Sequence, residues 1–195
     1  LRVAMAKLKP GVVYGEDYRA LLGACKGGGY ALPAVNVVGS NSVNAVLEAA
    51  ARNQSDIIVQ LSNGGAQFFA GQGMADVDAA RVIGAVSAAQ HVHLLAQYYG
   101  VCVVLHTDHA NRKLLPWIDS LIGEGEKYYK ANGRPLYTSH MLDLSEESLE
   151  DNLSICADYL KRMVPLEMSL EIELGVTGGE EDGGASDLDE TDNAK

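Results

Sequence analysis

Apolar and polar positions follow two alternating patterns along this chain of 195 residues. Short continuous apolar runs, rich in valine, isoleucine and leucine, have the length of strands buried in a parallel sheet. Between them lie longer stretches in which apolar residues recur every three to four positions, as in amphipathic helices. The pattern predicts strands at 30–38, 56–62, 101–105, 136–142 and 169–174. It predicts helices at 16–26, 41–53, 78–99, 113–131 and 145–163.

Residues that begin or end helices lie between these segments. Three glycines at 27–29 are a stop signal for the first helix. We expect Ser145 to be the N-cap of the last helix, with Glu146 and Glu147 in its first turn. We expect residues 63–65, Asn-Gly-Gly, to form a loop after the second strand.

The alternation of strands and helices implies an α/β fold with a parallel sheet and helices outside it. A doubly wound sheet and a (β/α)8 TIM barrel both agree with this order. Five strands are too few for a closed barrel of eight, so the barrel hypothesis makes residues 1–195 the N-terminal portion of a single barrel domain. Residues 178–195 are glycine-rich and acidic, and we expect a flexible loop or tail there; a loop cut short and a native disordered tail have the same composition.

Charge and cysteine content exclude several classes of protein. The net charge is −11, and residues 180–195 hold seven acids and one lysine, so no basic patch for nucleic acid exists. No apolar run approaches the length of about 18 residues that a membrane span needs, and no basic amphipathic stretch indicates a membrane surface. Three cysteines, odd in number and far apart, argue against disulfides, so we expect a reduced, cytoplasmic protein.

Polar side chains stand at the carboxyl end of every predicted strand. Ligands of α/β folds bind at those ends, where the strands bring their side chains together. One such residue would mean little, but agreement over five strands indicates a site. The residues are Asn36, Ser62, His106, Asp108, His109, Asp143, Glu171, Glu173, Glu180 and Glu181.

Asp108 and His109 are the strongest candidates for chemistry. An imidazole is a good zinc ligand, and a neighbouring carboxylate can act as general acid or base on a substrate that the metal polarises. The spacing His-x-x-His is a weak motif on its own. The alternative is that His106 and His109 are structural and donate hydrogen bonds to backbone carbonyls.

The acidic residues each have a plainer alternative. Glu171 and Glu173 share one face of their strand and need a partner, which is a metal ion or, more commonly, a network of arginine or lysine. Glu180 and Glu181 lie between glycines, either in a hinged loop that closes on a substrate or in a solvated acidic loop. Asp143 could simply cap the next helix.

The remaining polar residues also allow a plain interpretation. Ser62 could be a turn residue, or it could belong with 63–65 to a loop that brings backbone amides to an anion. We assign His91 and His93 to packing or to the surface, and His140 to the core as a histidine with satisfied hydrogen bonds.

The motifs together resemble the class II, metal-dependent fructose-bisphosphate aldolases, most closely their long, dimeric subgroup. The matching segments are ordered and extend over nearly the whole chain. They are YALPAVNVVGSNSVNAVLEAA (30–50), IIVQLSNGGAQFFAGQG (57–73), VVLHTDHANRKLLPWID (103–119), SHMLDLSEESLEDN (139–152) and LEIELGVTGGEEDG (170–183).

The resemblance implies a TIM-type barrel of which this chain supplies about the first five strands. Enzymes of the family are lyases of glycolysis and gluconeogenesis. They cleave fructose 1,6-bisphosphate to dihydroxyacetone phosphate and glyceraldehyde 3-phosphate, and run the reverse condensation. A catalytic zinc ion polarises the carbonyl of dihydroxyacetone phosphate. The implied partners are a phosphorylated sugar substrate and a second subunit in a homodimer.

The resemblance also assigns roles by motif position. His109 is implied as a catalytic zinc ligand and Asp108 as the acid/base at the aldehyde oxygen. Glu181 is implied as the base that takes a proton from dihydroxyacetone phosphate. Asn36 and Ser62 are implied as substrate contacts. A second divalent metal position is implied for Asp143, Glu173 and Glu180.

Some features of the family are not found in these residues. Its two other zinc histidines and its glycine-rich phosphate loops lie on later strands, and a catalytic zinc needs about three protein ligands. We therefore expect the 195 residues to be incomplete for activity. Ala110 stands where relatives often have cysteine or serine. Two other hypotheses stay open: a related aldolase acting on tagatose bisphosphate, and a truncated, non-catalytic interaction module.

Overall fold

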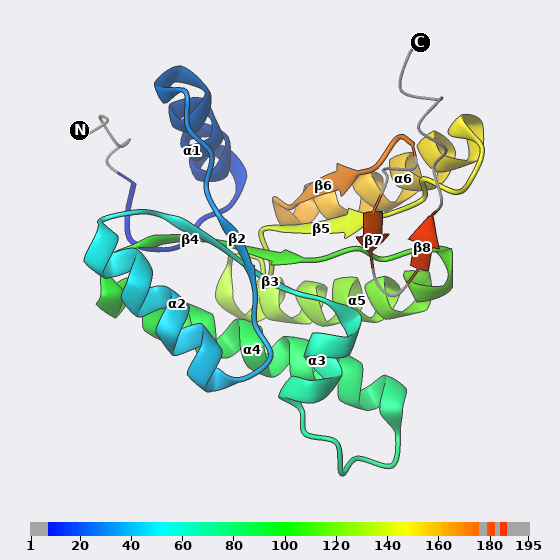
Figure 1. Cartoon of the computed structure of the whole chain (residues 1–195), viewed down its shortest axis with the longest axis horizontal. Helices are drawn as coiled ribbons and strands as arrows, with labels where there is room; N and C mark the ends of the chain where they lie inside the picture. The colour runs from blue at the N-terminus through cyan, green and yellow to red at the C-terminus, as the bar shows by residue number, and fades with distance from the viewer. Residues whose placement is uncertain (1–7, 176–178, 182–183, 187–195) are drawn as a thin grey trace.

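The structure is a computed structural model that describes residues 8–175, 179–181 and 184–186. Helices α2, α4 and α5 run along one side of the strands, and α1 stands on the other side (Figure 1). The strands are β1 (Gly11–Val12), β2 (Ala34–Asn36), β3 (Ile57–Leu61), β4 (Cys102–Thr107), β5 (Ser139–Leu142), β6 (Ser169–Ile172), β7 (Gly179–Glu181) and β8 (Gly184–Ser186). The helices are α1 (Gly15–Gly28), α2 (Ser40–Asn53), α3 (Asn63–Phe69), α4 (Val77–Tyr99), α5 (Leu115–Asn132) and α6 (Leu149–Met163), with 3-10 turns η1 (Arg112–Leu114) and η2 (Val164–Leu166).

Five strands pair in parallel in the order β2-β3-β4-β5-β6, with β1 beside the first residues of β4. Every strand of this path lies next to the strand that precedes or follows it in the chain, and helices form the connections. The predicted parallel α/β sheet is therefore confirmed. A doubly wound sheet reverses its strand order at a switch point. The sequential order of the described strands favours a barrel instead.

Side-chain alternation gives this sheet an apolar face and a polar face. On β3, Ile57, Val59 and Leu61 are buried among the helices, while Gln60 points to the opposite face. The apolar cluster joins β3, β4 and β5 to α2, α4, α5 and α6. Full burial of one such side chain stabilises the fold by about 1.5–3 kcal/mol, so the apolar face fixes the register of the sheet.

A second, smaller apolar cluster places α1 against the opposite face. Leu21 of α1 is buried with Val13, Cys102 and Val104, at the amino-terminal half of β4. Tyr18 packs against the same cluster. α1 therefore covers one end of the polar face and leaves the carboxyl ends of the strands open.

Two predicted strands begin later in the structure than the apolar runs do. The run at 30–38 contributes only β2, because the Tyr30 amide still bonds to the Cys25 carbonyl at the end of α1. The run at 136–142 contributes only β5, because β1 occupies the edge of β4 just before it.

The prediction that Ser145 caps the last helix is wrong. Ser148 is the N-cap of α6, and its hydroxyl oxygen accepts a hydrogen bond from the Asp151 amide at 3.1 Å. The Ser145 hydroxyl instead donates to Asp143 Oδ1 at 2.5 Å. The Ser145 side chain is thus bonded to a residue two positions before it, and Ser148 begins the helix.

The predicted loop at 63–65 is the first turn of α3. Ser62 is its N-cap, and its hydroxyl oxygen accepts a hydrogen bond from the Gly65 amide at 3.1 Å. Glycine at 65 also permits a close approach, because a Cβ there would lie 3.3 Å from the Val37 carbonyl oxygen. The antiparallel hairpin of β7 and β8 is likewise a feature that the sequence did not predict.

α3 crosses α4 in very close contact at Gly84. A Cβ at this position would lie 1.8 Å from the Ala66 carbonyl oxygen, so only glycine fits here. α4 is the longest helix of the described residues, with 23. No helix in the described part of the chain is both long and apolar enough to cross a membrane.

We predict that Gly84→Ala destabilises the chain by about 1–3 kcal/mol, because the added methyl group forces the two helices apart. The free energy of unfolding in urea measures the effect. Gly23→Ala in α1 is the control, since a Cβ there meets no atom within 4 Å. It should stabilise the chain by about 0.4–1 kcal/mol. Equal losses in both variants would contradict the close approach.

His140 of β5 is buried in the core, as predicted, and His93 of α4 takes the packing role that was one of its two predicted alternatives. His93 Nε2 lies 3.0 Å from the Leu136 carbonyl oxygen, and His140 Nδ1 lies 2.7 Å from Thr107 Oγ1. The second ring nitrogen of each has no hydrogen-bond partner among the described residues. Burial disfavours the charged imidazole, which lowers the pKa of His93 to about 4 and that of His140 to about 3.

These histidines predict a loss of stability in mild acid. Their pKa values lie below about 6.5 in the unfolded chain, so between pH 6.5 and 4 the unfolded state binds more protons. Stability should be full above pH 6.5 and should fall by about 1–2 kcal/mol per histidine at pH 5. Urea unfolding at pH 7.5 and 5 measures this loss. His93→Phe should reduce it; His91→Gln, at a position hydrogen-bonded to Asn44, should leave it unchanged.

Candidate metal centre

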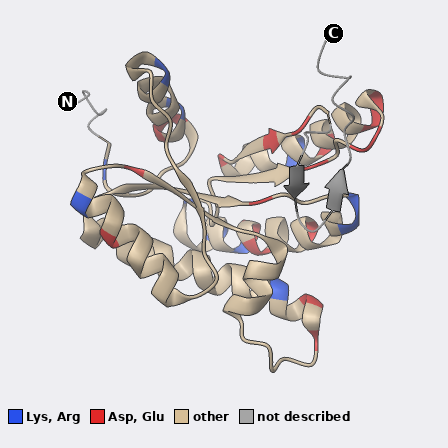
Figure 2. Cartoon of the chain, in the orientation of Figure 1, with Lys and Arg blue, Asp and Glu red and all other residues tan. Residues whose placement is uncertain are grey.

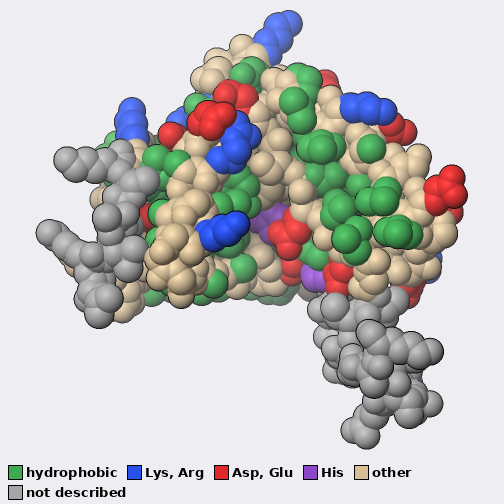
Figure 3. All heavy atoms as spheres, turned by 90° about the horizontal axis from the view of Figure 1, so that it is seen from above, with side chains coloured by type: hydrophobic (Ala, Val, Ile, Leu, Met, Phe, Trp, Pro, Cys, Tyr) green, Lys and Arg blue, Asp and Glu red, His purple; other side chains and the backbone are tan. Residues whose placement is uncertain are grey.

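The polar face of the sheet holds a cavity of about 550 Å3 at the carboxyl half of the strands. In Figure 3, histidine and acidic side chains lie next to one another in the middle of the face seen from above. Five of the predicted site residues line this cavity: His106, Asp108, His109, Glu171 and Glu173. The structure thus brings these five strand-end side chains to one cavity.

The charge of this cavity is one-sided. In the described sheet from β1 to β6, Glu171 is the one acid and there is no lysine or arginine (Figure 2). Among the described residues that line the cavity, three are acids and none is lysine or arginine. A concave site lined by one sign of charge concentrates ions of the opposite sign, which here are cations.

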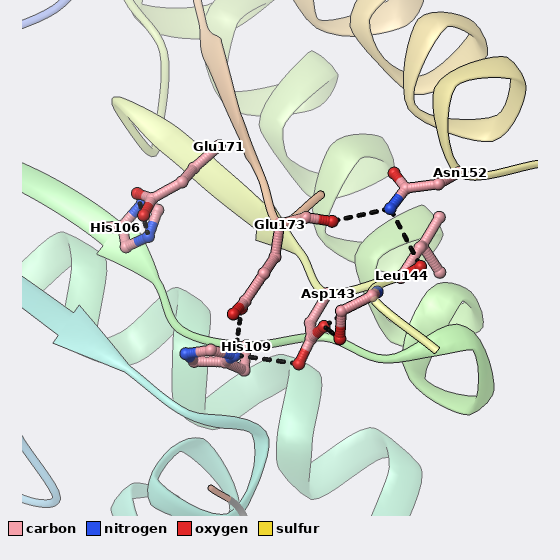
Figure 4. A network of polar contacts seen from close by, with 8 residues as sticks. His106, His109, Asp143, Leu144, Asn152, Glu171 and Glu173 are labelled. Atoms are coloured by element: carbon pink, nitrogen blue, oxygen red, sulfur yellow. Dashed lines mark hydrogen bonds and ion pairs between the residues drawn. The ribbon is translucent and has the colours of Figure 1, made fainter. Parts of the chain in front are cut away.

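His109, Asp143 and Glu173 form a compact group in which each residue offers one ligand atom (Figure 4). His109 follows β4, Asp143 follows β5 and Glu173 follows β6. His109 Nδ1 lies 3.1 Å from Asp143 Oδ2 and 3.6 Å from Glu173 Oε2. The three side chains are only 14–21% exposed, so their charges need partners. We call this group the His109 triad.

The His109 triad fits a divalent metal ion. An imidazole nitrogen with carboxylate oxygens is a donor set for zinc, with bonds of about 2.0–2.2 Å. Ligand atoms sharing such an ion lie roughly 3–4 Å apart, and the separations in the triad agree with this. All three ligand atoms lie within 4.8 Å of one another. An ion would replace the proton that His109 Nδ1 shares with the carboxylates.

Hydrogen bonds keep Asp143 ready to act as an anion. Burial works to raise the pKa of Asp143, but hydrogen bonds from Ser145 and His109 outweigh it and hold the pKa below its usual value. Metal binding requires a deprotonated carboxylate. The Ser145 hydroxyl that was predicted to cap a helix thus supports a metal ligand.

Asp108 lies outside the His109 triad and has a partner of its own. Asn36 Nδ2 donates a hydrogen bond to Asp108 Oδ2 at 2.7 Å, joining the end of β2 to the end of β4. Asn36 was expected to contact a substrate, and here it orients a carboxylate. The pair lies on the same face of the sheet as the cavity.

His106 belongs to a second polar cluster, one step deeper on β4 (Figure 4). Its Nδ1 lies 2.7 Å from Ser139 Oγ, and its Nε2 lies 3.4 Å from Glu171 Oε2. Burial lowers the pKa of His106, against the opposing effect of Glu171. The carboxylates of β6 thus face histidines instead of the lysine or arginine network that was the commoner alternative. The alternative for His106 and His109 was hydrogen bonding to backbone carbonyls. The partners named above for both histidines are side chains instead.

The structure does not bring every predicted residue to this group. Ser62 lies at the carboxyl end of β3 as the cap of α3 and is not among the residues that line the cavity. Glu180 and Glu181 lie in β7, and their side chains fall outside the described part of the chain, as does most of the acidic segment from residue 178.

Asn152 of α6 is a polar residue that the sequence analysis missed. Its side-chain amide donates to the backbone carbonyls of Leu144, at 2.9 Å, and Glu173, at 2.7 Å. A signal for it existed in the sequence. Asn152 stands on the apolar stripe of its helix, in the spacing of Cys156, Tyr159 and Met163.

The fold and the His109 triad define an α/β protein with a candidate divalent metal site at the ends of parallel strands. Residues 16–194 match the family model described as fructose-bisphosphate aldolase class-II, so the chain belongs to this family. The family that the motifs indicated is thereby confirmed.

Curated relatives agree with this assignment. A fructose-bisphosphate aldolase of Haemophilus influenzae is 57% identical over 194 residues, which are 96% of this chain and 54% of that protein. The fructose-bisphosphate aldolase class 2 of Escherichia coli K12 is 57% identical over 178 residues, or 90% of this chain and 50% of that protein. The chain spans about half the length of the curated relatives it matches.

A solved structure confirms the fold. The crystal structure of a fructose-bisphosphate aldolase from Campylobacter jejuni superposes with a TM-score of 0.85 at 54% identity. The superposition covers 92% of this chain and 51% of that one. The parallel α/β arrangement, with about five strands of the fold in this chain, is thus as predicted.

We predict that zinc raises the thermal unfolding midpoint of this chain through the His109 triad. An ion present at 100 times its Kd stabilises a folded protein by about 2.7 kcal/mol. His109→Ala should abolish the response in a thermal melt with and without Zn2+. His91→Ala is the control, because His91 contacts Asn44 outside the cavity, and it should respond like the wild type. An equal zinc response in His109→Ala would rule out the triad.

Proposed function

We propose that this chain is the N-terminal portion of a single aldolase barrel domain. The proposed reaction is metal-dependent cleavage of fructose 1,6-bisphosphate to dihydroxyacetone phosphate and glyceraldehyde 3-phosphate, with the reverse condensation. The observation that carries the proposal is the His109 triad beside Asp108, on a cavity whose described lining has no lysine. An aldolase that works through a Schiff base needs a lysine there.

The His109 triad would hold the metal. When bound, a zinc ion supplies positive charge that polarises the ketone carbonyl of the substrate. We propose that His109 is a ligand of this catalytic zinc. Asp143 and Glu173 would share this ion with His109, and the resemblance also implies for them, together with Glu180, a second divalent metal position close to it. The pKa of Asp143, held low by Ser145 and His109, keeps its carboxylate available for a cation.

Asp108 is the proposed general acid and base. In cleavage it takes the proton from the hydroxyl group of the carbon that becomes the aldehyde, and in condensation it returns that proton. Asn36 binds Asp108 Oδ2, while Oδ1 accepts no hydrogen bond within the described residues. We therefore propose that Oδ1 exchanges the proton with the substrate.

Further roles are proposed on the resemblance. Glu181 would take a proton from dihydroxyacetone phosphate, and Ser62 and Asn36 would contact the phosphorylated sugar. The Ser62 hydroxyl oxygen accepts from the Gly65 amide, and its hydrogen stays available to a substrate. We propose a cytoplasmic, zinc-dependent homodimer that acts in glycolysis and gluconeogenesis.

The names of the relatives support fructose bisphosphate over tagatose bisphosphate as the substrate. Both sugars would meet the same His109 triad and Asp108, so the described residues do not separate them. A truncated, non-catalytic module has no observation in its favour.

Metal removal tests the function. We predict that the whole protein loses aldol cleavage after dialysis against a chelator and regains it with Zn2+, because the metal supplies the electrophile. Borohydride added with substrate should not inactivate it, since no Schiff base forms. A coupled assay for the two triose phosphates measures the rate. Activity that survives metal removal, or inactivation by borohydride, would overturn the mechanism.

Two carboxylate variants extend this test: one tests the general acid and base, and the other is its control. Asp108→Asn should lower kcat by about 100- to 10,000-fold, the usual contribution of a general acid or base, while Zn2+ affinity is kept. Asp158→Asn removes an exposed carboxylate that pairs with Lys161 and should change neither quantity. No cleavage in the metal-loaded wild type would instead indicate a non-catalytic module.

A further inference from the structure

Asn152 is a buried amide that is fully engaged in hydrogen bonds. Its residue is 1% exposed, and it sits in α6 behind the ends of β5 and β6. Its side-chain nitrogen donates to two backbone carbonyls, those of Leu144 and Glu173 (Figure 4). Its side-chain oxygen lies 3.3 Å from Cys156 Sγ. Both donors of this amide are therefore used on segments that carry metal ligands.

The two carbonyls belong to residues that lie beyond the paired part of β5 and β6. The last paired residues of β5 and β6 are Leu142 and Ile172, so Asp143 and Glu173 each lie one residue beyond the register. The Asp143 amide bonds to the Ala110 carbonyl at 3.0 Å, which fixes the Asp143 segment to the segment of His109. This bond does not connect the Asp143 segment to the Glu173 segment. A further contact is therefore needed to fix the relative positions of all three triad residues.

We propose that Asn152 is the positioning residue that sets the separation of Asp143 and Glu173 and thereby shapes the His109 triad for a divalent cation. The inference rests on the proposed function, because it concerns the metal site of that function. Leu144 is the neighbour of Asp143, and Glu173 is itself a member of the triad. One buried amide thus holds both carboxylate-bearing segments.

Co2+ binding to the full 195-residue chain tests this role, because cobalt replaces zinc and absorbs visible light. Asn152→Leu keeps the size of the side chain and removes both donors. We expect it to weaken Co2+ binding by about 10- to 100-fold, as for other residues that orient metal ligands, and to alter the absorption spectrum of the bound ion.

Tyr137→Phe is the matched control. The Tyr137 hydroxyl is also buried and donates to the Ala85 carbonyl at 2.8 Å, away from the His109 triad. This variant should lose stability without a change in Co2+ affinity or spectrum. Cys156→Ala, which leaves both donors of Asn152 in place, should also bind Co2+ normally. If Asn152→Leu does not fold, Asn152→Ala, which also lacks the donors, takes its place.

Equal Co2+ affinity and identical spectra in the Asn152 variant and the wild type would overturn the proposal, even if the variant is less stable. A wild-type chain that binds no Co2+ would instead contradict the metal site of the proposed function. In that case, NMR of the metal-free chains decides on Asn152. Shifted His109 ring nitrogen signals in the Asn152 variant alone support the proposal, and unchanged signals overturn it.

Discussion

The register of β4 with its neighbours is the constraint on which the other features depend. β4 pairs with β3 from Val103 to Thr107, and with β5 at His106 and Thr107. Because side chains alternate along a strand, this register turns Val103 and Leu105 to the helices, and His106 and Asp108 to the cavity. A slip of one residue would exchange the two sets and place charged groups in the core. The apolar cluster therefore holds the polar site in place.

The polar face is stable only because its charges have partners. Glu171 faces His106, and Glu173 and Asp143 both face His109, while no described lysine or arginine takes part. With Asp108, the carboxylates at this site number four, against two histidines. The same arrangement that suits a cation thus leaves an excess of negative charge in its absence, which is a common trade of stability for function.

The sequence predicted those parts of the fold and site that depend on local patterns. Continuous apolar runs located β3 and β4, and the strand-end rule located Asp108 and His109. The start of α6 was misplaced because serine suits an N-cap at either 145 or 148, whereas in the structure Ser145 bonds to Asp143 and Ser148 is the cap. The role of Asn152 depends on carbonyls 8 and 21 residues away, which only the packing of α6 brings together.

The pairing of β1 also has a consequence for the order in which the molecule assembles. Thr138 Oγ1 donates to the Val13 carbonyl and accepts from the Leu105 amide, so one hydroxyl joins β1, β4 and the start of β5. Val13 and Thr138 are separated by 125 positions. During synthesis, the segment of Val13 emerges before β4 and β5 but finds its place only after both have been made. Val13 thus waits for residues more than 100 positions later in the chain, and contacts of such long range slow folding.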